Sequence, residues 1–276
     1  MKKILVPCDF TEISENALDY AIELTKYFSG SLVLLHNAQI PVINSEMGMT
    51  GFAYPDLVHD SEESLHNLAH RIQRNHPLIT DIECHTEMGT ASDTIIEYTQ
   101  KHNVDLIVMG ISGHGSKFMK LLFGSTAVEL SKKINIPVVI VPPAYKFQKI
   151  QNIAYACNYD KDIEKSTALI QVKYLNTLLG SNLQVLHVIP EDHELNLAES
   201  KIDCYVEEKL ENASHKTFII AEKSVSEGLL MFVENHDIDM LIVEPKKHSF
   251  FYNVFHESVT NEMAFFSPVP VLTIHG

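Results

Sequence analysis

The sequence predicts an α/β fold of two tandem open-sheet domains, each a largely parallel five-stranded sheet with helices on both faces. Short apolar runs alternate with segments whose apolar residues recur at helical spacing. The runs have no polar face, which is typical of parallel strands that are covered on both sides and joined by crossover helices. The same order of segments then occurs a second time, which indicates an internal duplication.

Strands and helices are predicted in strict alternation in the first half of the chain. The opening run "KILVPCD" is a strand, and Thr11 after it is suited to cap a helix, because its hydroxyl can accept a hydrogen bond from a free amide at the helix start. Each later strand is an apolar run, and each later helix carries its apolar residues at helical spacing. The predicted strands are residues 3–9, 30–38, 80–88, 105–110 and 137–143, and the predicted helices are residues 11–28, 60–75, 92–103 and 125–135.

Four segments of the second half match segments of the first half in the same order. "NIAYACNYD" matches "KILVPCDFT", "SNLQVLHVIP" matches "GSLVLLHNAQ", "ENHDIDMLIVEP" matches "QKHNVDLIVMGI", and "FSPVPVLTIHG" matches "INIPVVIVPPA". The halves meet near "PPAYKFQK", where two prolines end the last strand of the first copy. We therefore predict two domains, 1–147 and 148–276, each long enough to bury its own core.

Composition narrows the classes of function. The 276-residue chain has a formal net charge of -15, which opposes binding to nucleic acids and to anionic membranes. Its four cysteines form no CxxC pair, and the first apolar run is interrupted by Pro7 and Asp9, so neither a disulfide scaffold nor an export signal is expected. No run reaches the roughly 18 apolar residues of a spanning helix. We expect a cytoplasmic protein.

Three stretches of the first half resemble the universal stress protein family, in its tandem two-domain form. They are "ILVPCDFTEISENAL", "LVLLHN" and "VMGISGHGSKFMKLLFGSTAVELSKKINIPVVIVP". The resemblance covers nearly the whole chain and is weaker in the second half. Its most specific part is a glycine, two residues, a glycine, nine residues, then Gly-Ser or Gly-Thr before a helix.

This resemblance implies that the first domain binds ATP or another adenine nucleotide, with or without Mg²⁺. In the family, the glycines and the hydroxyl hold the phosphates, while the first two strands hold adenine and ribose. No catalytic or metal-binding residue is carried over. The implied nucleotide-binding residues are Pro7, Cys8, Asp9, Asn37, Met109, Gly110, Gly113, Gly124, Ser125 and Thr126.

The physics of the residues favours the same use of the glycine loop. Glycines at a strand end let the backbone approach a phosphate, and the free amides of a helix that begins near Gly124 complement negative charge. The alternative is that the glycines make turns and the hydroxyls cap a helix. Ten residues separate Gly113 from Gly124, where the family has nine, and Gly115 is expected to absorb the extra residue.

The second copy lacks the polar site. Glu244, Lys247 and Glu257 stand at its three glycine positions, and Asn158 stands where the first copy has Asp9. Carboxylates would face the phosphates, so we expect this half to bind no ATP and to serve as a structural partner. We expect the two halves to pair through their final strands, as single-domain members of the family dimerise through that strand. A further homodimer and an unidentified protein partner stay open.

Several other features receive structural interpretations. His66 and His70 have a spacing that can chelate zinc, but the predicted core stripe beside them turns both towards water. Cys8 is interpreted as a buried thiol, with no histidine assigned near it. The segment 39–60 is long for a loop, so Met47, Met49 or Phe52 could cover a ligand, with disorder as an equal alternative.

Three functions follow from these observations. The first is a regulatory stress-response protein that binds an adenine nucleotide, and the second is a structural or interaction protein whose glycine loop is empty. The third is a slow ATPase. No residue is identified as a catalytic base, so we expect a binding protein rather than an enzyme, and at most a weak ATPase.

Overall fold

The computed structural model describes ten stretches of the chain, which form two compact units. These units are Met1–Gly110 and Ile111–Gly276, and each is described by itself. The domain boundary predicted between residues 147 and 148 divides the repeats rather than these units, and it stays a prediction. The described residues are 2–38, 54–111, 126, 129–130, 133–143, 145–157, 167–190, 204–211, 213–244 and 267–276.

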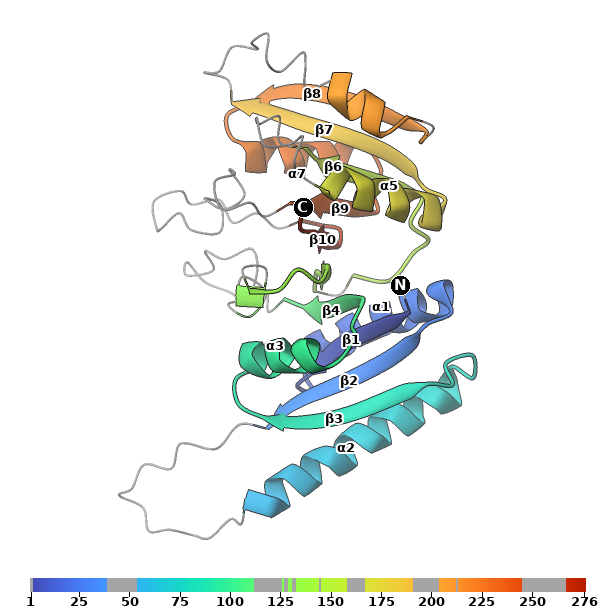
Figure 1. Cartoon of the computed structure of the whole chain (residues 1–276), viewed down its shortest axis with the longest axis vertical. Helices are drawn as coiled ribbons and strands as arrows, with labels where there is room; N and C mark the ends of the chain where they lie inside the picture. Colours follow the sequence, from blue (N-terminus) through green and yellow to red (C-terminus); the bar gives the residue numbers. More distant parts are fainter. Residues whose placement is uncertain are drawn as a thin grey trace, which may run out of the picture. The chain divides into compact units, whose positions relative to one another are not determined.

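The first unit contains a parallel sheet with the strand order β3-β2-β1-β4 (Figure 1). α1 and α2 lie on one face, where Arg71 of α2 and Glu15 of α1 form an ion pair with a distance of 2.8 Å from Nη2 to Oε1. α3 covers the opposite face. The elements are β1 (Lys3–Cys8), α1 (Glu12–Phe28), β2 (Ser31–Ala38), α2 (Tyr54–Asn75), β3 (Ile82–Met88), α3 (Ala91–Lys101) and β4 (Leu106–Gly110).

The caps of α1 and α3 explain where these helices begin. Thr11 accepts a hydrogen bond from the amide of Ser14, as the sequence predicts, and Thr90 accepts one from the amide of Asp93. α1 ends at Ser29, which has a left-handed φ of 50° and donates its backbone N–H to the carbonyls of Lys26 and Thr25. The ends of α1 therefore follow from its own sequence.

The second unit contains a longer sheet with the strand order β5-β10-β9-β6-β7-β8. All of these pairs are parallel except β5 with β10, which are antiparallel, with Leu272 opposite Val139. Residues 204–209 are helical. The elements are β5 (Val138–Val141), β6 (Asn152–Ala156), α5 (Ala168–Leu179), β7 (Asn182–Pro190), β8 (His215–Glu222), α7 (Val225–Asn235), β9 (Met240–Val243) and β10 (Val271–Thr273).

The two repeats share details as well as strand order. The orders β3-β2-β1-β4 and β8-β7-β6-β9 match element by element. Asp105, before β4, accepts hydrogen bonds at Oδ2 from the amides of Lys2 and Lys3, at 2.7 and 3.0 Å. Asp239, before β9, accepts two from the amides of Gln151 and Asn152, at 2.7 and 2.9 Å. In both repeats, a carboxylate therefore ties the start of the fourth strand to the start of the first.

Gly110, at the end of β4, is fixed by close packing against α1. A Cβ atom at this position would lie 2.6 Å from Cγ2 of Ile13 and 2.7 Å from its carbonyl oxygen. Real Cβ atoms do not approach backbone that closely, so only glycine lets the first turn of α1 lie against this strand end. The fold itself therefore requires one of the predicted phosphate-binding glycines.

The structure corrects one predicted element boundary. α2 begins at Tyr54, so the prediction that 39–60 is loop is wrong for residues 54–60. Met47, Met49 and Phe52 lie outside the described residues.

Among the residues of the predicted helix 125–135 that the structure describes, Thr126, Glu129, Leu130 and Lys133 are helical. In the described ranges, no helix is both long and apolar enough to cross a membrane.

We predict that Gly110→Ala destabilises the first unit. The added methyl group must displace backbone at Ile13, which we expect to lower the free energy of unfolding by about 1–3 kcal/mol. Chemical denaturation followed by circular dichroism measures this change. Gly180→Asn is the matched control, because a Cβ at Gly180 meets nothing within 4 Å and asparagine tolerates its left-handed backbone. Equal stability of Gly110→Ala and wild type would contradict the close packing.

We predict a pH-dependent stabilisation from Asp105. Partial burial alone would raise its pKa, but hydrogen bonds from the amides of Lys2 and Lys3 outweigh this effect and lower the pKa. The stabilisation that ionised Asp105 contributes to the folded state is therefore complete above the unfolded pKa of about 3.9. It is lost as the pH falls through the lower pKa of the folded state. Asp105→Ala should cost about 1 kcal/mol at pH 7, allowing for solvent exposure. Unfolding curves at pH 7 and pH ~3 should show the gap between wild type and variant closing, and a gap that widens would refute the assignment.

Candidate functional site

The predicted site residues at the strand ends come together at one edge of the first sheet. Cys8 of β1 lies opposite His36 of β2. β1 and β4 pair with Leu5 opposite Ile107, so the same register brings Gly110 to the level of Cys8. Because parallel strands share an edge at their carboxyl ends, this is where an open α/β sheet binds ligands. Pro7, Cys8, Asp9, Asn37, Met109 and Gly110 therefore occupy one edge.

Asp9 is an exposed, ionised carboxylate in the turn between β1 and α1. Its Oδ1 accepts hydrogen bonds from the amide and the hydroxyl of Thr11, at 3.0 and 2.6 Å. Partial burial alone would raise the pKa of Asp9, but hydrogen bonds from Thr11 and Ser14 outweigh burial and lower it. Asp9 can therefore accept a hydrogen bond from a ligand hydroxyl or amino group at neutral pH.

Cys8 is a buried thiol rather than a nucleophile. Its side chain is 3% exposed, and Sγ lies 3.4 Å from the carbonyl oxygen of Val6. Burial, together with the nearby charge of Asp9, raises the pKa of the thiol far above its usual range, which suppresses the reactive thiolate. A histidine that was not assigned to this place lies nearby, with Nδ1 of His36 2.7 Å from the Cys8 carbonyl oxygen. His36 contacts the backbone, however, and the thiol itself stays inert.

An aromatic pair stands beside Asp9. The rings of Phe10 and His36 lie 4.8 Å apart between centroids and are inclined at 37°. Phe10 is 41% exposed and has a left-handed φ of 59°, which is uncommon for a large side chain. Strained backbone of this kind clusters at binding sites. The partly exposed ring of Phe10 offers an apolar face next to a carboxylate.

Asn37 and Gly110 complete the described part of the edge. Asn37 is partly exposed, and its side-chain amide has no hydrogen-bond partner among the described residues. It can therefore both donate and accept hydrogen bonds with a ligand. The packing of Ile13 against Gly110 brings the first turn of α1 to the same edge.

The rest of the predicted phosphate loop lies outside the described residues. This applies to Gly113, Gly124 and Ser125, and to Lys247 and Glu257 at the corresponding positions of the second repeat. Thr126 is described only as a helical, partly exposed residue. The structure therefore describes the half of the predicted site that is built from strand ends.

At the same edge of the second repeat, the two residues that match His36 and Gly110 are buried. Glu244 stands at the position of Gly110 and is 8% exposed. His187 is 7% exposed, and its Nδ1 lies 3.0 Å from the carbonyl oxygen of Cys157, repeating the contact between His36 and Cys8. This repeat keeps the histidine contact and carries a carboxylate in place of the glycine.

Sequence reasoning missed Phe10 and His36. The signal for His36 was present, because "LVLLHN" and "LQVLHV" place a histidine at matching points of the two repeats. No comparable signal marks Phe10, because its exposure depends on the left-handed backbone of one turn.

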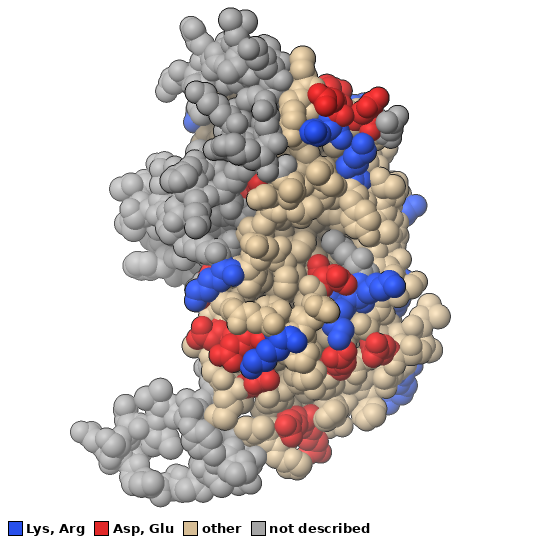
Figure 2. All heavy atoms as spheres, viewed as in Figure 1, with Lys and Arg blue, Asp and Glu red and all other residues tan. Residues whose placement is uncertain are grey.

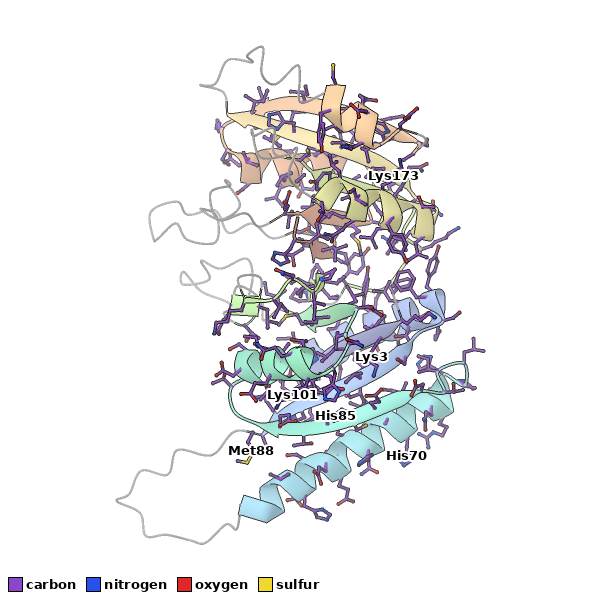
Figure 3. The ribbon with its side chains drawn as sticks, in the orientation of Figure 1. Lys3, His70, His85, Met88, Lys101 and Lys173 are labelled. Carbon is purple, nitrogen blue, oxygen red and sulfur yellow. The ribbon has the colours of Figure 1, made fainter. Side chains whose placement is uncertain are left out.

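The histidine pair on α2 faces solvent, as predicted. His66 and His70 are exposed, while Leu65, Leu68 and Ile72 of the same helix are buried. Figure 3 shows His70 on the outer side of α2. Across the part of the chain that the structure describes, no three histidine, cysteine or acidic side chains gather to hold a metal ion.

Comparisons with known proteins assign the family. The sequence profile described as "Universal stress protein family" matches residues 1–142. A universal stress protein of Methanocaldococcus jannaschii is 26% identical over 144 residues, which is 51% of this chain and 81% of that protein. A stress response protein of Bacillus subtilis is 27% identical over 163 residues, which is 50% of this chain and 96% of that protein.

A solved structure extends the likeness to the whole chain. The crystal structure of a universal stress protein from Archaeoglobus fulgidus superimposes with a TM-score of 0.72, covering 99% of this chain and 96% of that chain. Because the two sequences are only 21% identical, this likeness shows a shared fold and nothing further. Because the family profile spans more than half of the sequence, the chain belongs to the universal stress protein family.

Proposed function

We propose that this chain binds an adenine nucleotide in its first repeat and acts in the cytoplasm as a regulatory stress protein. One observation carries the proposal: ionised Asp9 and Asn37, whose side-chain amide has no hydrogen-bond partner among the described residues, directly follow Cys8 and His36, which are opposite each other on neighbouring strands. A carboxylate and an amide at this edge suit the hydroxyl and amino groups of a nucleoside. The exposed face of Phe10 beside them suits a planar base.

The phosphates would be held by the glycine loop and by the helix that follows it. The loop begins after Gly110, which ends β4, and it contains Gly113, Gly124 and Ser125. Free amides at a helix start attract anions, and Thr126 is already helical. Mg²⁺, where present, would accompany the phosphates.

The second repeat serves as a structural partner in this proposal. Its edge carries buried Glu244, so a phosphate there would meet a carboxylate in place of a glycine. The negative charges of the carboxylate and the phosphate would repel each other, which opposes binding. We therefore expect one nucleotide per chain.

A structural protein without nucleotide is the second candidate function. It is favoured by the packing at Gly110, because the contact with Ile13 explains this glycine without any ligand. A slow ATPase is the third candidate function. Its nucleotide site would be the same site in the first repeat that is proposed above. Titration of the wild type separates the first candidate from the second.

We also propose that the two repeats pair within one chain through their final strands. The antiparallel contact of β5 with β10 supports this pairing, because β5 closes the first repeat and β10 closes the second. Each strand would otherwise leave backbone donors and acceptors at a sheet edge. An intramolecular partner satisfies them at any protein concentration.

We predict that calorimetric titration with ATP finds one site per chain. Asp9→Ala should weaken binding at least about tenfold, equivalent to about 1.4 kcal/mol, because it removes an ionised acceptor. Gly124→Glu, which copies Glu257, should abolish binding by repelling phosphate.

Asn158→Ala is the matched control for Asp9→Ala, since it changes the corresponding position of the second repeat and should leave affinity unchanged. Two equivalent sites per chain, or full affinity of folded Gly124→Glu, would refute the assignment. A wild type that binds no adenine nucleotide would leave the structural candidate standing.

We predict that Val139→Cys combined with Leu272→Cys forms a disulfide within one chain. Residues opposite each other in antiparallel strands have Cα atoms about 4.5–5.5 Å apart, which a disulfide can span. Mass spectrometry of unreduced peptides detects the bond. Val139→Cys with Ile274→Cys is the out-of-register control. Bonds between chains instead of within one chain would contradict the pairing.

A further inference from the structure

The outer face of α5 carries an apolar stripe. Ile170, Tyr174 and Leu178 are 63%, 56% and 38% exposed, and their spacing of four residues places them along one side of the helix. The opposite side is buried, through Leu169, Val172, Leu175 and Leu179 among others. The helix is therefore apolar on a second side, which its own unit does not cover in the described part of the chain.

The first repeat carries only one of the three apolar positions of this stripe. α1 and α5 both end at a left-handed residue, Ser29 and Gly180, which fixes the correspondence between the helices. Counting back from these ends, Ile170 matches Asp19 and Tyr174 matches Glu23. Asp19 is exposed and Glu23 forms an ion pair with Lys26 on the surface. Two positions that carry surface carboxylates in the first repeat are thus apolar in the second, while Leu178 matches Tyr27, which is 42% exposed.

α5 itself carries little charge, although the chain as a whole is acidic. Lys173 is the only charged residue in α5, and its ammonium donates to the carbonyl oxygens of Lys209 and Glu211, at 3.3 and 2.6 Å. Figure 3 labels Lys173, and Figure 2 shows a mostly tan surface over α5 with charged side chains beside it. With a net charge of -15, two copies of this chain repel each other, and the side chains of α5 add no negative charge to that repulsion.

We propose that this stripe is the contact surface of a symmetric homodimer. Along the stripe an aliphatic side chain is followed by an aromatic one, Tyr174, and then by a second aliphatic one. The stripe is therefore complementary to itself when the α5 helices of two copies lie antiparallel. A two-fold axis would pass beside Tyr174, and Ile170 of one copy would meet Leu178 of the other. This self-complementarity is the reason that we propose a second copy as the partner.

The size of the stripe predicts a weak dimer. Three side chains on a twelve-residue helix cannot alone supply the roughly 800 Å² per partner of a standard interface. Association is therefore concentration-dependent and reversible. It is independent of the nucleotide site, which belongs to the first repeat.

Sedimentation velocity over a concentration series tests the proposal on the full chain. The wild type should shift from monomer to dimer by about 100 µM, as expected for a dissociation constant in the micromolar range. Ile170→Asp combined with Tyr174→Glu, which restores the residues of α1, should raise the dissociation constant at least about tenfold. These residues are tolerated at the same places in α1, and unfolding curves check that the variant folds.

Gln73→Glu combined with Gln100→Glu is the matched control. It adds the same two negative charges at exposed positions of α2 and α3, and should leave the dimer intact. A wild type that stays monomeric throughout the series would overturn the proposal. So would a dimer that survives Ile170→Asp with Tyr174→Glu, or one that the control disrupts equally.

Discussion

The double pairing of β1 determines where everything else in the first unit can lie. β1 is hydrogen-bonded to β2 on one side and to β4 on the other, and Ile4, Leu5 and Val6 are completely buried. Parallel neighbours on both sides require crossover helices, and burial on both faces requires that these helices cover both faces. As a result, the chain leaves β1, β2 and β4 at one edge. The candidate site exists because these three strands are parallel.

The duplication lets one repeat serve as a control for the other. Contacts present in both repeats belong to the shared frame, and the histidine-to-carbonyl contact and the paired amides on Asp105 and Asp239 are of this kind. Positions that differ mark where the repeats have taken different roles. Gly110 against Glu244 is one such difference, at the ligand edge, and the outer faces of α1 and α5 are another.

The sequence was sufficient to predict what depends on periodicity and repetition. The α/β class and the Thr11 cap were predicted from apolar spacing and one hydroxyl, because burial and helix capping are local effects. The start of α2 at Tyr54 was missed, although Pro55 in the first turn of a helix is a known signal. The place of Phe10 at the site could not be predicted, since no pattern in the sequence indicates its left-handed backbone. Likewise, the contact of Ile13 with Gly110 depends on how α1 lies on the sheet.

The β5–β10 contact has a consequence for how the chain folds during synthesis. Thr273 of β10 donates its hydroxyl to the carbonyl oxygen of Val138, a residue 135 positions earlier. A ribosome that adds roughly 5–20 residues per second needs on the order of ten seconds to make that length of chain. During this interval β5 lacks its antiparallel neighbour, and its four apolar residues form an open edge that can pair with other nascent chains. Slow translation between the repeats would therefore prolong the period in which the emerging chain is most prone to aggregate.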